Sequence, residues 1–325
     1  MVKVEDVQFV RYGVTNLERT EEFLRDFGLV TTRRDGTALY MRGTGRAPVV
    51  YVAELDQASG LRSIALRVRD DEAQRAQRLP GVSTAYRLDM PGGGMAVKAE
   101  MPGGLYLELV WNITEADPLP DRPSVPLNFG GDRARVNATQ RPALEPARVR
   151  RLGHVALGVP DAQRCMEWLS AHLGMLVSDT LLVPNAGGVL GYFMRCDRGS
   201  QPADHHTFLI ANLPEHGAHH VSFEVGDLDA LHQGHTWLRK RGYLPQWGVG
   251  RHLLGSQIFD YWWDPDGNRV EHFTDGDLFD SSVAPGAPLE ATNESLAIWG
   301  PEVPTSFFAV KNPDAPASMP VQKSR

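Results

Sequence analysis

Three side chains suited to metal binding lie in separate predicted strands of the second half of the chain. They are His154, His220 and Glu271. Successive residues of a strand point to opposite faces, and the valine, leucine and phenylalanine residues around both histidines alternate onto the other face. The two imidazoles are therefore not committed to apolar packing. Two histidines and one carboxylate form the ligand set that holds non-haem Fe(II) and leaves coordination positions open.

The histidines of the chain are concentrated close to this ligand set. Five of the 11 histidines fall in one short segment, namely His205, His206, His216, His219 and His220. A single histidine on a strand more often serves packing than metal binding, so the ligand set needs support from the organisation of the whole chain. The density of imidazoles in one half is a first indication of chemistry there.

An internal duplication provides that support. The segment VRYGVTNLERTEEFLRDFGLV from Val10 aligns with VALGVPDAQRCMEWLSAHLGMLV from Val155, and both predict a strand, a turn and a helix. Residues 63–68 match 220–225, and residues 101–108 match 264–271. In this alignment Phe9, Ser63 and Glu108 occupy the positions of His154, His220 and Glu271. Only the glutamate recurs, so we interpret the first half as scaffold and the second as the working half.

The duplicated pattern predicts an α+β fold of tandem βαβββ modules. Two modules in each half would form an open, barrel-like sheet around a cavity, and the length of 325 residues fits two domains of about 150 residues. We expect an N-terminal domain without metal at 1–116, a proline-rich linker at 117–149, a catalytic metal domain at 150–284 and an extended tail at 285–325. Within the tail, Trp299, Phe307 and Phe308 are expected to attach part of it to the body.

The composition of the chain indicates what kind of binding partner and which cellular compartment to expect. The net charge of −7 without long runs of like charge argues against nucleic acid and anionic membranes, and favours a small molecule. Cys165 and Cys196 cannot form a disulfide framework, which predicts a reducing compartment. No apolar stretch approaches the roughly 18 residues that a membrane span requires. We therefore expect a cytoplasmic protein.

The sequence resembles the two-domain type I extradiol catechol dioxygenases of the vicinal oxygen chelate superfamily, over roughly residues 4–277. The most specific part of the resemblance is Gly250-Arg251-His252, followed by Tyr261, Asp264-Pro265-Asp266-Gly267 and Glu271. It is similar to that family's signature of G-x-H, an apolar residue before tyrosine, D-P-x-G and glutamate.

The resemblance implies a function and roles for individual residues. His154, His220 and Glu271 would bind Fe(II), with Mn(II) as the other candidate metal. His206 would be the acid-base histidine, and His252 and Tyr261 would orient the substrate. The expected reaction is extradiol cleavage of a catecholic ring with O2 in the breakdown of aromatic compounds. Members of the family are often homo-oligomers, and we expect the same here.

The sequence departs from this signature in places, and it is compatible with two other functions. Asp260 stands where the family has an apolar residue, and His205 is a rival to His206 for the acid-base role. We expect His205, His216 and His219 to be surface, loop or packing residues, and His272 to point away from the face of Glu271. The alternative functions are a glyoxalase-like metal isomerase or lyase, which does not need the trio of His206, His252 and Tyr261, and an aromatic or drug-binding protein of the same fold.

Overall fold

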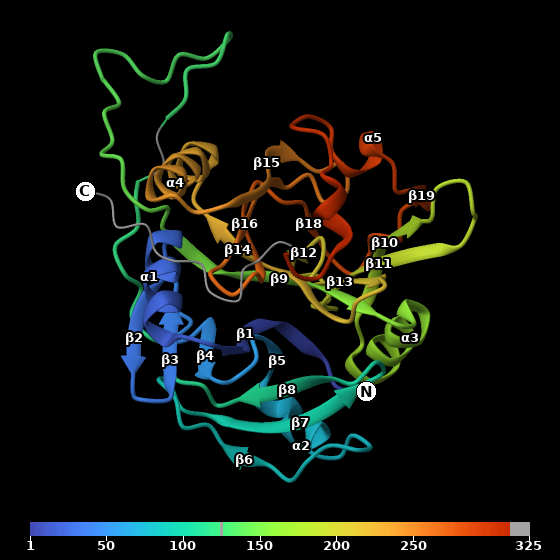
Figure 1. Ribbon diagram of the computed structural model, residues 1–325. Helices are drawn as coiled ribbons and strands as arrows, with labels where there is room; N and C mark the ends of the chain where they lie inside the picture. The colour runs from blue at the N-terminus through green and yellow to red at the C-terminus, as the bar shows by residue number, and fades with distance from the viewer. Residues whose placement is uncertain (124–125, 313–325) are drawn as a thin grey trace.

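Two mixed β-sheets, one from each half of the chain, form the body of the protein in a computed structural model that describes residues 1–123 and 126–312 (Figure 1). In the described residues the first sheet has eight strands in the order β2-β3-β4-β1-β5-β8-β7-β6, and the second has nine in the order β15-β16-β17-β14-β9-β13-β11-β10-β19. A two-stranded sheet joins β12 to β18. Helices and strands alternate as βαβββ units in both halves, so the predicted α+β fold class is confirmed.

Each half consists of two modules. The first half contains β1 (Val4–Val14), α1 (Leu17–Phe27), β2 (Val30–Arg34), β3 (Ala38–Arg42), β4 (Tyr51–Leu55), β5 (Gly60–Val68), η1 (Asp70–Glu72), α2 (Ala73–Ala76), β6 (Tyr86–Arg87), β7 (Met95–Met101) and β8 (Leu105–Trp111). The second half contains β9 (Val149–Val159), α3 (Ala162–Leu173), β10 (Leu176–Leu182), β11 (Val189–Arg195), β12 (Ala203–Asp204), β13 (Phe208–Asn212), β14 (Gly217–Val225), α4 (Leu228–Arg241), β15 (Pro245–Arg251), β16 (Ile258–Trp263), β17 (Arg269–Thr274) and β18 (Leu278–Phe279).

The first helix of each half begins and ends by the same local chemistry. The side chain of Asn16 accepts a hydrogen bond from the backbone of α1, and that of Asp161 does so for α3. Both helices end at a glycine in the left-handed region, Gly28 with φ 111° and Gly174 with φ 64°. Side-chain caps and left-handed glycines satisfy backbone groups that a helix end leaves unpaired. The two copies of the duplicated segment therefore share the signals that start and stop their helices.

Strand registers establish that the two halves are aligned as the sequence comparison predicts. In the second sheet, Ser222 of β14 pairs with His154 of β9 on one side and with Glu271 of β17 on the other. In the first sheet, Ala65 of β5 pairs with Phe9 of β1 and with Glu108 of β8. The three predicted ligand positions thus have counterparts at the same sheet positions, and the predicted correspondence is confirmed.

Helices α1 and α4 lie side by side where the two halves meet (Figure 1). The carboxylate of Asp26 on α1 accepts hydrogen bonds from Trp237 Nε1 at 3.0 Å, Arg241 Nε at 2.8 Å and the hydroxyl of Tyr243 at 2.9 Å. The Asp-Pro-Asp-Gly turn also crosses the boundary, because Asp266 accepts from the backbone of Thr15 at 3.0 Å. The scaffold half therefore supports the half that carries the predicted ligands.

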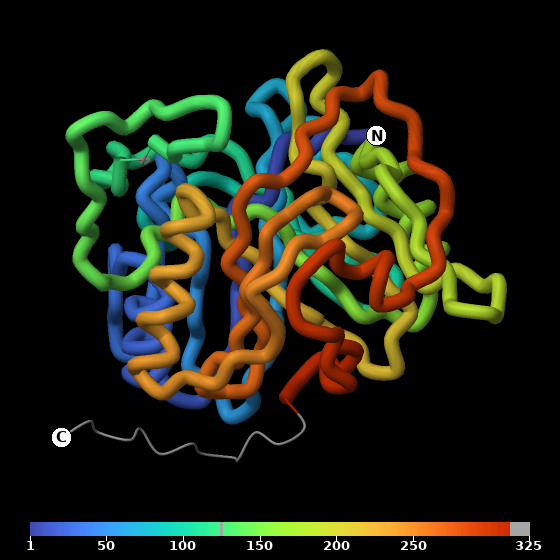
Figure 2. The backbone as a smooth tube through the Cα atoms, turned by 90° about the horizontal axis from the view of Figure 1, so that it is seen from above, coloured from blue at the N-terminus to red at the C-terminus, as the bar shows by residue number. Residues whose placement is uncertain are grey.

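Two segments outside the sheets complete the chain. Between β8 and β9 the described residues contain neither helix nor strand, apart from an isolated bridge between Asn128 and Arg133. The C-terminal segment contains β19 (Leu289–Glu290), α5 (Asn293–Leu296) and η2 (Thr305–Phe308), and runs across the second half (Figure 2). Phe307 is buried as predicted, whereas the side chains of Trp299 and Phe308 are 43% and 40% exposed. Trp299 is attached instead by its carbonyl, which accepts from the backbone of Arg251.

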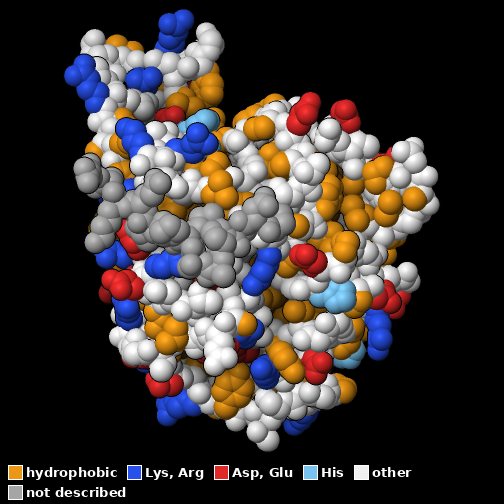
Figure 3. Space-filling model, viewed as in Figure 1, with side chains coloured by type: hydrophobic (Ala, Val, Ile, Leu, Met, Phe, Trp, Pro, Cys, Tyr) orange, Lys and Arg blue, Asp and Glu red, His pale blue; other side chains and the backbone are white. Residues whose placement is uncertain are grey.

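The surface carries charges of both signs. Acidic and basic side chains are scattered among one another over most of the face in Figure 3, in keeping with the modest net charge of −7. Among the helices of the described residues, none combines the length and the apolar composition needed to cross a bilayer.

Candidate active site

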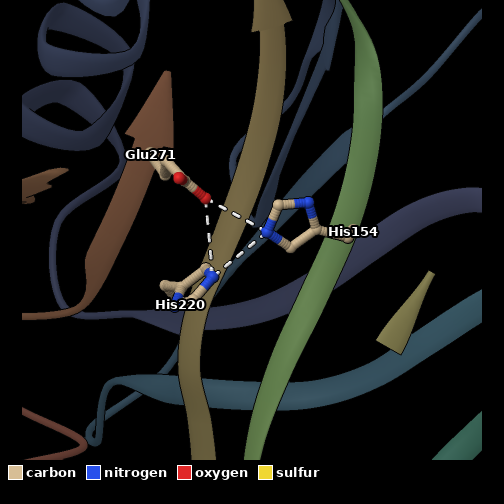
Figure 4. A group of neighbouring side chains, drawn as sticks. All are labelled: His154, His220 and Glu271. Carbon is tan, nitrogen blue, oxygen red and sulfur yellow. Dashed lines mark hydrogen bonds and ion pairs between the residues drawn. The ribbon is translucent and has the colours of Figure 1, made fainter. Parts of the chain in front are cut away.

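His154, His220 and Glu271 converge from three adjacent strands, β9, β14 and β17 (Figure 4). Nε2 of His154 lies 3.2 Å from Nε2 of His220 and 3.1 Å from Oε2 of Glu271. Nε2 of His220 lies 3.5 Å from the same carboxylate oxygen. All three side chains are buried. One ligand atom from each residue therefore points to a common centre.

The spacing and the unmet bonding of these atoms fit a divalent metal. Ligand atoms about 2.1 Å from one metal lie about 3.0 Å apart when they subtend a right angle, close to the separations here. Apart from the close approach of Nε2 of His154, no well-formed hydrogen bond reaches the carboxylate oxygens of Glu271 among the described residues, and none reaches Nδ1 of His154. A buried carboxylate without donors is costly unless a cation neutralises it. Burial also holds the pKa of His220 well below its ordinary value, which favours the neutral imidazole that binds metals.

His219 is a part of this site that the sequence analysis missed. We expect a surface, loop or packing residue, and its side chain is buried, but its Nδ1 also lies 2.8 Å from Nδ1 of His220. A metal-bound histidine donates its second N–H to a neighbouring acceptor that fixes the ring. Simple strand alternation would place His219 on the face opposite to His220, but β14 has an irregular register between Ala218 and His220. Such bulges re-aim side chains relative to simple alternation. The adjacent histidine pair was the available signal.

His206, and not His205, lines the cavity beside the metal ligands. Its ring centroid lies 4.1 Å from that of His154. Burial, and after it the neighbouring imidazoles of His154 and His205, keeps the pKa of His206 well below its ordinary value. The neutral imidazole that results has a lone pair with which to accept a proton.

His252 and Tyr261 form a hydrogen-bonded pair on the same side of the site. Nε2 of His252 lies 2.8 Å from the hydroxyl of Tyr261 and 4.0 Å from Oε1 of Glu271. Nδ1 of His252 lies 2.7 Å from the carbonyl oxygen of Leu296 in the C-terminal segment. Burial, followed by the charge of Glu271, raises the pKa of Tyr261 well above its ordinary value. Tyr261 therefore stays a neutral hydrogen-bond donor near the metal ligands.

A cavity opens in front of the ligands. Its walls combine the imidazoles already described with apolar side chains, including Leu181, Leu190, Phe193, Leu209, Leu254 and Leu296. Phe307 and Phe308 of the C-terminal segment also line it. Among the described residues, no lysine or arginine lines the cavity. The cavity thus suits a largely apolar small molecule with polar groups at the metal end.

Two further residues of interest have structural partners away from the site. The carboxylate of Asp260, the residue that departs from the signature, contacts His235 Nδ1 at 2.9 Å and accepts from Trp262 Nε1 at 2.6 Å. This places Asp260 against helix α4. His272 points away from Glu271 as expected, and its Nε2 lies 2.6 Å from the carbonyl oxygen of Phe27 in the other half.

Comparison with known proteins agrees with this site. Residues 151–272 match the model of the Glyoxalase/Bleomycin resistance protein/Dioxygenase superfamily. This segment of the second half is therefore similar to members of that superfamily. The match contains all three metal-ligand candidates. The recognition of this superfamily in the sequence is therefore confirmed.

The chain spans about half the length of the curated relatives that it matches. The chain is 36% identical over 186 residues to Metapyrocatechase 2 of Cupriavidus necator, a match that covers 57% of this chain and 54% of that protein. It is 26% identical over 164 residues to a biphenyl-2,3-diol 1,2-dioxygenase of Paraburkholderia xenovorans, covering 50% of this chain and 51% of the relative.

Solved structures extend the likeness of fold to nearly the whole chain. Homoprotocatechuate 2,3-dioxygenase from Brevibacterium fuscum, in an anaerobic complex with 3,4-dihydroxyphenylacetate, superposes with a TM-score of 0.76 at 21% identity over 95% of this chain and 93% of that one. A Mn(II)-bound glyoxalase from Novosphingobium aromaticivorans gives a TM-score of 0.77 at 21% identity over 94% of both chains. The two-domain architecture of the superfamily is therefore shared by dioxygenases and by a glyoxalase.

Proposed function

We propose that this protein is an extradiol dioxygenase that cleaves a catecholic ring with O2, as an Fe(II)-dependent enzyme of aromatic breakdown in the cytoplasm. The observation that carries the proposal is the position of His206, His252 and Tyr261 around the His154, His220 and Glu271 centre. A glyoxalase-like isomerase needs the metal centre but not this trio. Relatives that match the chain are named metapyrocatechase and biphenyl-2,3-diol 1,2-dioxygenase, and this supports the same choice.

The roles of the residues follow from their positions. His154, His220 and Glu271 would hold the metal. When bound, Fe(II) supplies chelation of the two catechol oxygens and redox access to O2 at open coordination positions. His206 would take a proton from a catechol hydroxyl at its neutral imidazole and later return it. Tyr261 and His252 would hydrogen-bond the oxygen atoms on which negative charge develops.

The cavity favours one class of catechol. Because no cationic side chain among the described residues lines it, a carboxylate substituent would lose its hydration without gaining a partner, at a cost of several kcal/mol. The leucines and phenylalanines would instead bury an apolar substituent. We therefore expect an uncharged, alkyl- or aryl-substituted catechol. The metal-free first half would act as scaffold, in the domain arrangement predicted from the sequence, and the assembly would be a homo-oligomer.

Oxygen uptake tests the proposal. The purified protein is loaded with Fe(II) or Mn(II) without air and offered catechol, 3-methylcatechol, 2,3-dihydroxybiphenyl and 3,4-dihydroxyphenylacetate. We expect O2 consumption with a yellow ring-opened product, and a higher kcat/KM for the uncharged substituted catechols than for the carboxylate. His206→Phe should retain its metal and lose turnover. The absence of O2 uptake with every catechol and both metals would overturn the proposal and leave the isomerase or lyase and the aromatic or drug-binding protein as the alternatives.

A further inference from the structure

A series of hydrogen bonds leads from the partly buried Asp179 through the buried His205 to His206. Oδ2 of Asp179 lies 2.7 Å from Nε2 of His205, and Nδ1 of His205 lies 3.0 Å from Nδ1 of His206. His205 is 1% exposed and does not line the cavity. Asp179 and His205 therefore contact His206 from outside the lining of the cavity.

When both imidazoles are neutral, the hydrogen bonds that join Asp179, His205 and His206 can have only one arrangement of donors and acceptors. An ionised carboxylate only accepts, so His205 donates from Nε2 to Asp179. The Nδ1 of His205 then carries a lone pair and accepts the hydrogen of Nδ1 of His206. The second nitrogen of His206, Nε2, is left with the lone pair, and it belongs to the ring that lines the cavity. The carboxylate of Asp179 thus sets the tautomer of His206 by acting through His205.

We infer that Asp179 and His205 are positioning residues for His206, which they hold with its Nε2 lone pair available to the substrate. The inference rests on the proposed function, in which His206 accepts a catechol proton. An imidazole with its hydrogen on Nε2 could not accept that proton. The pair would therefore act on the rate of the chemical step more than on binding of substrate or metal.

The surroundings of His205 hold its ring in place. Its backbone carbonyl accepts from the hydroxyl of Ser178 at 2.6 Å, and its backbone N–H donates to Asp277 at 2.9 Å. Gly255 packs directly on the ring, because a Cβ there would lie only 3.0 Å from Nδ1 of His205. The aromatic ring of Phe193 contacts both His205 and His206. A residue can orient its neighbour only when its own side chain is held in one orientation, as these contacts hold the ring of His205.

Two substitutions of His205 separate positioning from packing. His205→Leu fills space but removes the acceptor, so we expect kcat to fall roughly 10- to 100-fold while KM stays within about 2-fold and metal content is unchanged. His205→Asn places Oδ1 where Nδ1 of histidine lies and restores an acceptor for His206, so most of the lost kcat should return. His216→Leu, which removes an exposed imidazole, is the matched control and should behave as the parent. Full kcat in His205→Leu, or no recovery in His205→Asn, would overturn the inference.

Asp179→Ala tests the other end without changing either ring. It leaves Nε2 of His205 without its carboxylate acceptor, so the tautomers of His205 and His206 are no longer fixed. We therefore expect kcat to fall, by less than in His205→Leu. Parent-like kcat in Asp179→Ala would exclude the carboxylate from the role.

A structural readout is independent of catalysis. Neutron diffraction from crystals of the metal-loaded protein locates the hydrogens, and we expect one on Nδ1 of His206 and one on Nε2 of His205. A hydrogen on Nε2 of His206 with none on its Nδ1 would refute the inference even if ring cleavage is observed. Conversely, if the parent protein cleaves no catechol, the proposed function fails while the hydrogen positions still decide the inference.

Discussion

Arg11 Nε lies 3.2 Å from Oε1 of Glu108, at the sheet position where the second half places its metal ligand Glu271. Glu108 also accepts hydrogen bonds from Ser63 and from the hydroxyl of Tyr86 at 2.9 Å. Burial alone would raise the pKa of Glu108, but Arg11 and these donors bring it below its ordinary value. Phe9 occupies the position of His154. In the first half the guanidinium of Arg11 neutralises Glu108, whereas the equivalent Glu271 of the second half faces the candidate metal.

Removal of Arg11 should therefore destabilise the scaffold half without affecting metal binding. Arg11→Leu leaves a buried carboxylate without its counter-charge, and we expect the free energy of unfolding to fall by roughly 3 kcal/mol. Urea denaturation measures this change. In the double variant Arg11→Leu with Glu108→Leu, part of the loss should be recovered because no buried charge remains. Equal destabilisation in the single and double variants would contradict this account.

Loss of Glu271 should remove the metal. In Glu271→Ala only two neutral imidazoles remain in the ligand set, so we expect metal content after dialysis to fall at least 10-fold, in line with the tenfold or greater losses seen when even outer-shell partners are removed. Elemental analysis of protein purified in parallel provides the measurement. His206→Phe is the control, since it changes a buried neighbour without removing a ligand. Full metal occupancy in Glu271→Ala would exclude it as a ligand.

Asp260 should matter for stability and not for the reaction. Asp260→Ala leaves the indole N–H of Trp262 and the imidazole of His235 without their acceptor, so we expect a loss of roughly 2 to 4 kcal/mol in the free energy of unfolding. Asp260→Asn retains an acceptor and should lose less. Thermal unfolding gives the comparison, and KM and kcat of the folded variant should stay close to the parent values. A selective loss of kcat at parent stability would assign Asp260 to the site instead.

The Asp-Pro-Asp-Gly turn should make stability depend on pH. Burial, and after it the charge of Asp266, raises the pKa of Asp264 to about 7 from its ordinary 3.8, although hydrogen bonds from Asn268 oppose the shift. The folded protein therefore binds this proton more tightly than the unfolded chain. The contribution of Asp264 to stability is complete below pH 4 and is lost as the pH rises towards 7. In Asp264→Asn that loss cannot occur, so the stability of the variant relative to the parent should improve from pH 5 to pH 8. Urea denaturation at several pH values tests this, and parallel curves would exclude Asp264 as the titrating group.

Local patterns in the sequence were sufficient for the fold class, the duplication and the metal ligands. Strand alternation separated His154 and His220 from the core, and the repeated spacing of Glu108 and Glu271 aligned the halves. Such patterns survive in a linear sequence because each strand has a fixed period of two and each helix has chemical signals at its ends, such as Asn16 and Gly28.

Other features depended on contacts between residues far apart in the chain. The irregular register of β14 turned His219 toward His220, and an irregularity in a strand is not visible in residue types. Asp179 lies 26 positions before His205, its partner, and the carbonyl of Leu296 reaches His252 from 44 positions away. The sequence by itself therefore indicated which side chains form the candidate metal site, through the periodicity of the strands together with the duplication. Only the tertiary structure decided which side chains support them, because those hydrogen bonds join segments that meet only after the sheet and the C-terminal segment have packed together.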